Sequence, residues 1–357
     1  PTNRLEILSS TFAKLSNYSA NQQLAYSGYN LMNLEERKRL KENDVRQSLQ
    51  VTGKLGNTAL YGLITLGYNS QDENLNVAND SLLLPTYFTI KEGLYGVLSW
   101  VATHSNMYAL EAGSKWSLPK GYNIALALRQ SYNKDHLDTD DTSLDNDKAE
   151  GIYKKQSGSL IFEKTTGLLR FKVNASLTEN KYQQPSKSES SSAKFNYNSL
   201  LRVVFSPKSE LILTGSRETH QIDLNRLVDF PIHLAYDRIQ KSSTISSPFI
   251  NKDAYSIHYR LINNYSNLLL FVSGMYSNTK GGGLAGVTQK GITRNLAYSD
   301  GGNEEWISLH GVISKGIGHW PVDANIKVSW THLTSSLRHP KIFVKEFCYF
   351  LMSCHQH

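Results

Sequence analysis

Cysteine is nearly absent from this 357-residue sequence. The two cysteines, Cys348 and Cys354, both lie within the last ten residues, so a disulfide framework cannot hold the body of the chain together. Cys354 stands beside His355 and His357, a set that could bind a soft metal. Because no further ligands are predicted nearby, we interpret the set as incidental and predict no metal site. A body without thiols suits the oxidising space outside an inner membrane.

Long hydrophobic runs are missing as well. Runs such as Leu268–Val272 are far shorter than the roughly 18 residues that a membrane-spanning helix requires. Only 39% of the residues are hydrophobic, and the mean hydropathy is -0.40. These values exclude helical insertion into a membrane. They do not exclude a β-barrel, whose strands show alternation with little bulk hydrophobicity.

Concentrated positive charge is also lacking, although the net charge is +7 and the pI is near 9.1. The basic residues are mostly dispersed along the chain, without a helix-turn-helix pattern or an RNP-like run. We therefore predict no nucleic-acid partner. Dispersed Lys and Arg are typical of solvated faces and barrel interiors.

The motifs of common catalytic sites do not occur. There is no HExxH, no GxSxG and no GxxxxGK[ST], and the KGGG run at Lys280–Gly283 is interpreted as a flexible loop tip. The sequence therefore predicts a protein that is not an enzyme and that has no cofactor.

One segment, residues 133–150, is rich in carboxylates and is predicted to be a long loop. Hard cations such as calcium bind several oxygen ligands, which closely spaced carboxylates can supply. The candidate ligands are Asp138, Asp140, Asp141 and Asp145. The EF-hand order with its glycine is not present, so a solvated acidic loop is the favoured interpretation.

The feature that the sequence does contain is strict alternation of apolar and polar residues, clearest over 169–178. Its apolar positions include Leu169, Phe171, Val173 and Leu177, which we predict to face lipid. The polar positions between them include Arg170, Lys172 and Asn174. Together with Arg129 and Arg202 on other strands, these three are predicted to face the lumen and to line the path of a substrate.

Short turns separate the alternating segments, and long polar connections separate the resulting hairpins. The turns are Leu55-Gly56-Asn57, Pro119-Lys120-Gly121, Thr166-Gly167, Pro207-Lys208-Ser209, Asn264-Tyr265-Ser266 and, more loosely, Gly316–Pro321. The long connections are 70–92, 133–150, 180–194, 220–251 and 278–303. Six turns predict about twelve antiparallel strands. Short turns at one end and long loops at the other are typical of outer-membrane barrels, in which the turns are periplasmic.

Aromatic residues cluster near the ends of the expected strands. They are Tyr61, Tyr68, Trp100, Tyr122, Tyr132, Tyr255, Tyr259, Tyr276, Trp306 and Trp330. Such residues form girdles at both membrane interfaces of a barrel. Ordinary β-propensity also enriches Tyr and Trp in sheets, so both interpretations stay open.

The two ends of the chain follow the pattern less well. Residues 1–44 are an uncertain segment with a strand pattern at 5–15, followed by the charged stretch Leu34–Gln47, which is either a helix or, as we prefer, a solvated excursion between strands. Residues 45–337 are predicted to be barrel strands, and 338–357 an irregular tail without an aromatic closing residue. The start at Pro1 indicates a removed signal peptide or a fragment.

The segment from Asp253 to Lys315 resembles the C-terminal portion of Bacteroidota-type TonB-dependent outer-membrane receptors. The residues that carry the resemblance are Tyr255, Ser256, Tyr259 and Arg260, then Tyr276, Ser277, Thr279 and Lys280, then Asn303, Trp306, Ser314 and Lys315. The resemblance implies a barrel of about 22 strands with an N-terminal plug. The chain would then be part of such a barrel, because neither a plug nor a closing strand is visible.

The resemblance also implies the function. Such receptors import a scarce nutrient, such as a glycan or siderophore, with energy from the TonB complex acting through the plug. Outer-membrane lipid and a surface substrate-binding lipoprotein would be further partners, and the long loops with the lumen-facing side chains would set specificity. Three alternatives stay open: a smaller complete porin or channel, a secreted β-sandwich adhesin or structural surface protein, and an outer-membrane hydrolase with a site assembled on its loops.

Overall fold

The structure, a computed structural model, describes residues 4–26, 32–79, 96–141, 147–185, 187–235, 238–240, 243–263, 268–281, 284–290, 293–316, 322–335, 344–346 and 355–356. Thirteen long strands of 13 to 24 residues form the main sheet. They are β1 (Arg4–Tyr26), β2 (Met32–Leu55), β3 (Thr58–Asn79), β4 (Gly96–Ser117), β5 (Tyr122–Asp141), β6 (Lys148–Lys164), β7 (Leu169–Gln183), β8 (Ser190–Ser206), β9 (Ser209–Gln221), β12 (Phe249–Asn263), β13 (Leu268–Lys280), β16 (Asn303–Gly316) and β17 (Val322–Ser335).

Shorter elements complete the described residues. They are β10 (Ile232–Ala235), β11 (Arg238–Gln240), β14 (Leu284–Lys290), β15 (Thr293–Ser299), β18 (Val344–Glu346), β19 (His355–Gln356) and two 3-10 turns, η2 (Pro119–Gly121) and η3 (Leu224–Arg226). No helix in this described part of the chain has the length and hydrophobicity needed to cross a membrane.

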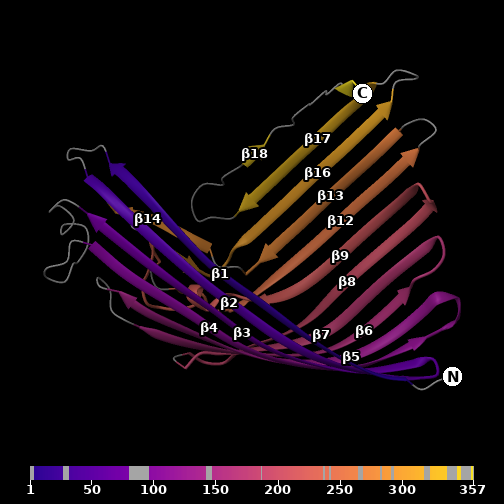
Figure 1. Cartoon of the computed structure of the whole chain (residues 1–357), viewed down its shortest axis with the longest axis horizontal. Coiled ribbons are helices and arrows are strands. Elements are labelled where there is room, and N and C mark those ends of the chain that lie inside the picture. Colours follow the sequence, from indigo (N-terminus) through magenta and orange to yellow (C-terminus); the bar gives the residue numbers. More distant parts are fainter. Residues whose placement is uncertain are drawn as a thin grey trace.

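The main sheet is an antiparallel meander in which each long strand pairs with the next long strand along the chain. It runs from β1 at one edge to β17, with β18 and β19 beyond it. Figure 1 shows that the sheet curves strongly, so that its two limbs face each other across a trough. The predicted all-β, antiparallel barrel architecture is confirmed, with thirteen long strands in place of about twelve.

The predicted short turns lie side by side at one end of this sheet, which we call the turn end. Backbone hydrogen bonds connect them: Ser117 donates to the carbonyl of Asn57 (2.9 Å), Thr165 to Gly121 (3.0 Å), and Val204 to Leu168 (2.8 Å). The turn at 264–266 and most of 316–321 lie outside the described residues, but the strands on either side of each are paired antiparallel. The prediction of hairpins is therefore confirmed.

At the opposite end, which we call the loop end, the strands continue further than the sequence predicted. β3 reaches Asn79, β5 reaches Asp141 and β7 reaches Gln183, so much of each predicted loop is paired strand. A spanning strand needs only about 9–11 residues. These strands are therefore longer than a membrane span requires.

The charged stretch Leu34–Gln47 is neither a helix nor a solvated excursion. It is part of β2 and pairs with β1 on one side and β3 on the other. The charges alternate along a strand whose neighbours are equally polar, as in the ion pair between Lys14 and Glu42 (2.9 Å). Because the residues that face each other across these strands are polar, the stretch shows no alternation of apolar and polar residues. The sequence pattern therefore does not reveal this strand.

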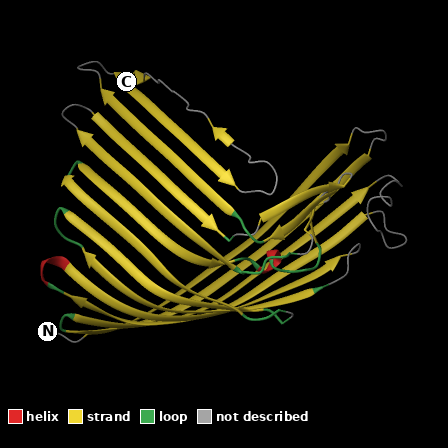
Figure 2. Ribbon diagram, turned by 180° about the vertical axis from the view of Figure 1, so that it is seen from behind, coloured by secondary structure: helices red, strands yellow, loops and turns green. Residues whose placement is uncertain are grey.

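Two connections leave the main sheet at the loop end and form a second sheet with the order β10-β11-β15-β14. Residues 222–235, which we call the inner loop, fold into the trough, where η3 lies within the curve of the sheet (Figure 2). Leu224, Val228 and Ile232 of the inner loop pack on Leu137 of β5. A second apolar cluster joins Ile222 and Leu227 to Tyr182 of β7. The core of the molecule therefore lies between loop and sheet.

Candidate functional site

The two faces of the main sheet differ in chemistry because side chains alternate along each strand. We call the side that contacts the inner loop the inner face and the other side the outer face. Register places the apolar residues of successive strands in rows on the outer face, for example Leu128, Gly158, Leu177 and Phe195. Leu128 is 71% exposed and Leu177 is 70% exposed, so this apolar band has no protein partner in the described chain.

The four residues predicted to face lipid, Leu169, Phe171, Val173 and Leu177, all lie on the outer face within this band. Aromatic rings border the band. Tyr108 and Tyr132 lie 6.2 Å apart toward the loop end, and Tyr122, Phe162 and Phe171 cluster at the turn end. Two of the aromatic residues expected in girdles, Tyr61 and Trp306, instead lie on the inner face, where Tyr61 donates to Glu111 (3.1 Å).

The five residues predicted to face the lumen lie on the inner face but are not gathered at one place. They are Arg129, Arg170, Lys172, Asn174 and Arg202. Arg129 and Asn174 line one cavity of about 370 Å³, and Lys172 lines another. Arg202 is held by Glu210, which also pairs with Arg260 (2.9 Å). Arg170 donates to the carbonyl of Gly167 (3.2 Å).

The predicted acidic loop is largely strand, because Asp138, Asp140 and Asp141 belong to β5. Asp138 is ion-paired with Lys148 (3.2 Å) and lies 3.0 Å from a ring nitrogen of His136. Asp145 lies outside the described residues. Among the described residues, no three His, Cys, Asp or Glu side chains are arranged to hold a metal ion.

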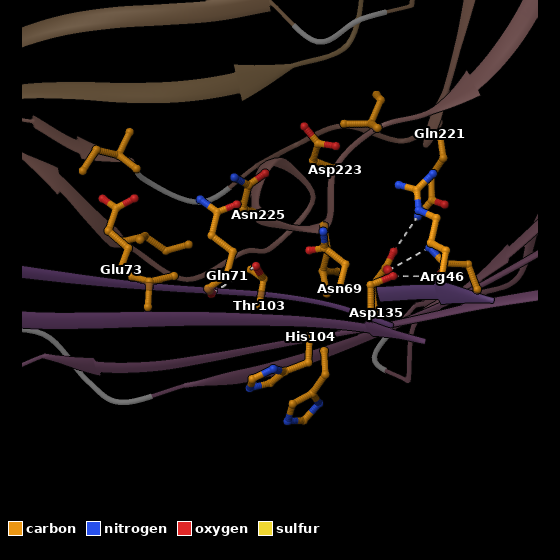
Figure 3. A pocket seen from close by; sticks show the side chains of 18 residues that line it. Arg46, Asn69, Gln71, Glu73, Thr103, His104, Asp135, Gln221, Asp223 and Asn225 are labelled. Atoms are coloured by element: carbon orange, nitrogen blue, oxygen red, sulfur yellow. Dashed lines mark hydrogen bonds between the residues drawn. The ribbon is translucent and has the colours of Figure 1, made fainter. Parts of the chain in front are cut away.

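The most elaborate site lies at the loop end, in a cavity of about 500 Å³ between the inner loop and strands β2 to β5 (Figure 3). The sheet supplies mainly amides and hydroxyls: Asn69, Gln71, Thr103, Ser105 and Asn133. The inner loop and the end of β9 supply Gln221, Asp223 and Asn225 together with apolar side chains. His104 borders the cavity only through its backbone side, because its ring points away from it.

Asp135 joins the wall of this cavity to the end of β9, where the inner loop begins. Its carboxylate accepts hydrogen bonds from the side chains of Asn133 (2.8 Å) and Gln221 (3.2 Å), and Asn133 in turn accepts one from Ser105 (2.8 Å). Asp135 lies beyond Tyr132, past the apolar band. Burial raises the pKa of its carboxyl, the hydrogen bonds oppose that shift, and the charge of Asp223 adds to it.

The other charges at the cavity are already compensated. Arg46 pairs with Asp44 through two hydrogen bonds of 2.9 and 3.0 Å, and Glu73 lies 2.5 Å from Lys38. Asp135 and Asp223, in contrast, form no ion pair with any residue that the structure describes. Among the described residues, the cavity therefore presents two carboxylates without an ion-pair partner, surrounded by neutral hydrogen-bonding groups.

The residues of this cavity were not predicted as a site. The available signal was the length of the 220–251 connection, which marked a loop expected to affect specificity but not its inward fold. That fold depends on apolar residues such as Leu224 and Val228 finding Leu137, roughly ninety positions earlier in the sequence. Contacts between such distant residues produce no periodic pattern in the sequence.

Comparison with solved structures finds the same sheet in larger barrels. The structure of BauA, the ferric preacinetobactin receptor of Acinetobacter baumannii, matches with a TM-score of 0.50 at 8% identity, over 93% of this chain and 56% of that one. The outer-membrane transporter YddB of Escherichia coli matches with a TM-score of 0.50 at 9% identity, over 93% of this chain and 54% of that one. The chain therefore has the fold of part of a β-barrel like the barrels of these two proteins.

This chain spans little more than half the length of each of these two solved chains. A search with protein-family models finds no match, and a search of curated proteins finds none either. At such low identity the likeness establishes the arrangement of the strands. Substrate and partners have to be argued from this chain's own residues.

Proposed function

We propose that the chain forms the greater part of the barrel of a TonB-dependent receptor in the outer membrane, which imports a nutrient rather than catalysing a reaction. The observation that carries the proposal is the division of one curved sheet into an apolar outer face and a polar inner face. Lipid solvates the first face, and a wet lumen suits the second. The shared fold with BauA and YddB supports the same role.

The direction of transport follows from the two ends. The turn end is periplasmic, where a plug domain of the intact receptor would receive energy from the TonB complex. The loop end is extracellular, where the inner loop and the cavity beneath it meet the incoming substrate. A surface lipoprotein that delivers substrate would dock at this end. The Bacteroidota type of receptor is the subclass that the residues of β12, β13 and β16 favour.

The proposal predicts opposite results for charge on adjacent residues of β7. Leu177→Arg places a guanidinium in lipid, which costs about 2–4 kcal/mol near the midplane of the bilayer. Ser176→Arg places the same group on the inner face, where water is present. We expect the Leu177→Arg protein to lose heat-modifiable migration on a gel of the outer-membrane fraction. The Ser176→Arg protein should still show it.

Uptake supplies the second arm of this test. Nutrient import by cells that carry the intact receptor should stop when the proton-motive force is dissipated, because TonB depends on it. Import that continues unchanged would favour the porin. A protein that is soluble without detergent, with both variants folded, would favour the β-sandwich.

A further inference from the structure

From the cavity beneath the inner loop we infer a binding site for a hydroxyl-rich ligand that carries an ammonium group, an inference that rests on the proposed import function. A volume of about 500 Å³ lies within the range of small-molecule sites, roughly 300–1,000 Å³. The site is bounded by the sheet on one side and by the inner loop on the other, so a ligand there contacts both.

The neutral part of the lining decides the ligand's polarity. Five side-chain amides, which belong to Asn69, Gln71, Asn133, Gln221 and Asn225, and the hydroxyls of Thr103 and Ser105 converge on one space. Amides offer both donors and acceptors, and a hydroxyl does the same. Such a lining matches a ligand with many hydroxyl groups, each of which donates and accepts. Ile222 and Leu224 provide an apolar surface for the ligand's carbon skeleton.

The charged residues of the lining decide which charge the ligand carries. Arg46 could attract an anion, but Asp44 holds it in a two-point ion pair, and Lys38 is likewise engaged by Glu73. Asp135 and Asp223 are left as the uncompensated charges, and Figure 3 shows them on the two sides of the space, one on the wall and one on the loop. A carboxylate or phosphate on the ligand would be repelled, whereas an ammonium group would gain charge-assisted hydrogen bonds.

The test uses three monosaccharides that share a ring and differ in charge: glucosamine, glucose and glucuronate. Binding of each to the full chain in detergent is measured by saturation-transfer NMR and by calorimetry. We expect glucosamine to bind most tightly and glucuronate least. Asp135→Asn keeps a side chain that accepts from Gln221 and should lower glucosamine affinity about fivefold to tenfold while leaving glucose unchanged.

Asp72→Asn is the matched control. Asp72 lies on β3 between the cavity residues Gln71 and Glu73, so alternation places it on the outer face. It should leave all three affinities unchanged. Glucuronate binding as tightly as glucosamine, or an Asp135→Asn variant with an unchanged ratio of glucosamine to glucose, would overturn the inference, as would the absence of binding by all three sugars.

Failure here and failure of the proposed function are distinguishable. An intact receptor that shows heat-modifiable migration and energy-dependent import, yet binds no glucosamine, refutes only this ligand class. A chain that binds glucosamine but never enters the membrane refutes the transport role and leaves the cavity assignment intact.

Discussion

The turn end and the loop end of the same sheet are stabilised in different ways. At the turn end, neighbouring turns are joined by backbone hydrogen bonds, such as the one from Thr165 to Gly121, and few side chains are buried. At the loop end, the inner loop brings apolar side chains onto the inner face and buries Leu137 and Val228 completely. One end is built from local geometry, and the other from contacts between distant segments.

The difference matters for function because the candidate cavity belongs entirely to the end with distant contacts. One side of the cavity is the sheet, and the other is the inner loop, which the apolar cluster around Val228 holds in place. The hydrogen bond from Gln221 to Asp135 fixes the end of β9 from which this loop starts. Loops positioned by a rigid scaffold are where binding residues concentrate. Substitutions at the two ends should therefore differ in how much stability they remove and in which residues show faster hydrogen exchange.

The largest effect is expected from Leu137→Ala at the loop end. Leu137 is fully buried against Leu224, Val228 and Ile232, and removing such a side chain costs about 2–5 kcal/mol, partly through the cavity that remains. The loss should release the inner loop while the strands stay paired. Amide hydrogen exchange in 224–228 should therefore accelerate about tenfold or more, with β7 unaffected.

Leu128→Ala is the control for this variant, since Leu128 lies on the same strand but on the outer face and is 71% exposed. It removes the same atoms without opening a protein cavity and should leave exchange in the inner loop as it was. Equal acceleration in both variants would mean that the inner loop is not held by this cluster.

A smaller effect is expected at the turn end, from Gly121→Ala. Gly121 has a φ of +77°, and a Cβ there would lie 2.2 Å from Oγ1 of Thr166, a hydroxyl that donates to the carbonyl of Lys120 (3.0 Å). Strain of this kind costs about 2–3 kcal/mol. The midpoint of urea unfolding in micelles should fall, while exchange in the inner loop stays unchanged.

Gly167→Ala separates the two causes of that strain. Gly167 has a φ of +88°, and no atom lies within 4 Å of the point that the alanine methyl carbon would occupy, so only the backbone contribution of about 1–2 kcal/mol applies. If Gly167→Ala lowered the free energy of unfolding as much as Gly121→Ala does, the contact with Thr166 would contribute nothing to the cost of Gly121→Ala.

The same contrast explains how much of the molecule can be predicted from the sequence. The turns at Thr166-Gly167 and Pro119-Lys120-Gly121 are predictable because turn chemistry and alternation act over a few residues, and the face of each residue in 169–177 follows from period two. β2 is not predictable over Leu34–Gln47 because its partners are polar. The cavity is not predictable because Gln221 and Asp135 stand 86 positions apart and meet only in the folded chain.

The smallest effect is a pH dependence confined to the loop end. Burial raises the pKa of Asp135 in the folded chain, with Asp223 of the inner loop adding to the rise and hydrogen bonds from Gln221 and Asn133 opposing it. Among the described residues, Tyr182 of β7 lies near Asp135, and the titratable residues Arg46, Glu73, His104 and His136 line the same cavity. A raised folded-state pKa means that the ionised carboxylate disfavours the docked loop.

The docked inner loop is therefore expected to have its full stability below the unfolded pKa of Asp135 and to lose part of it as the pH rises through the folded value. Exchange in 222–224, corrected for intrinsic rates, should be a few-fold slower at pH 4 than at pH 7. Asp135→Asn should remove this dependence, because its amide does not titrate. Glucosamine binding should respond with the opposite sign and weaken as Asp135 gains its proton. A pH dependence that persists in Asp135→Asn would show that Asp135 is not its source and would overturn this prediction.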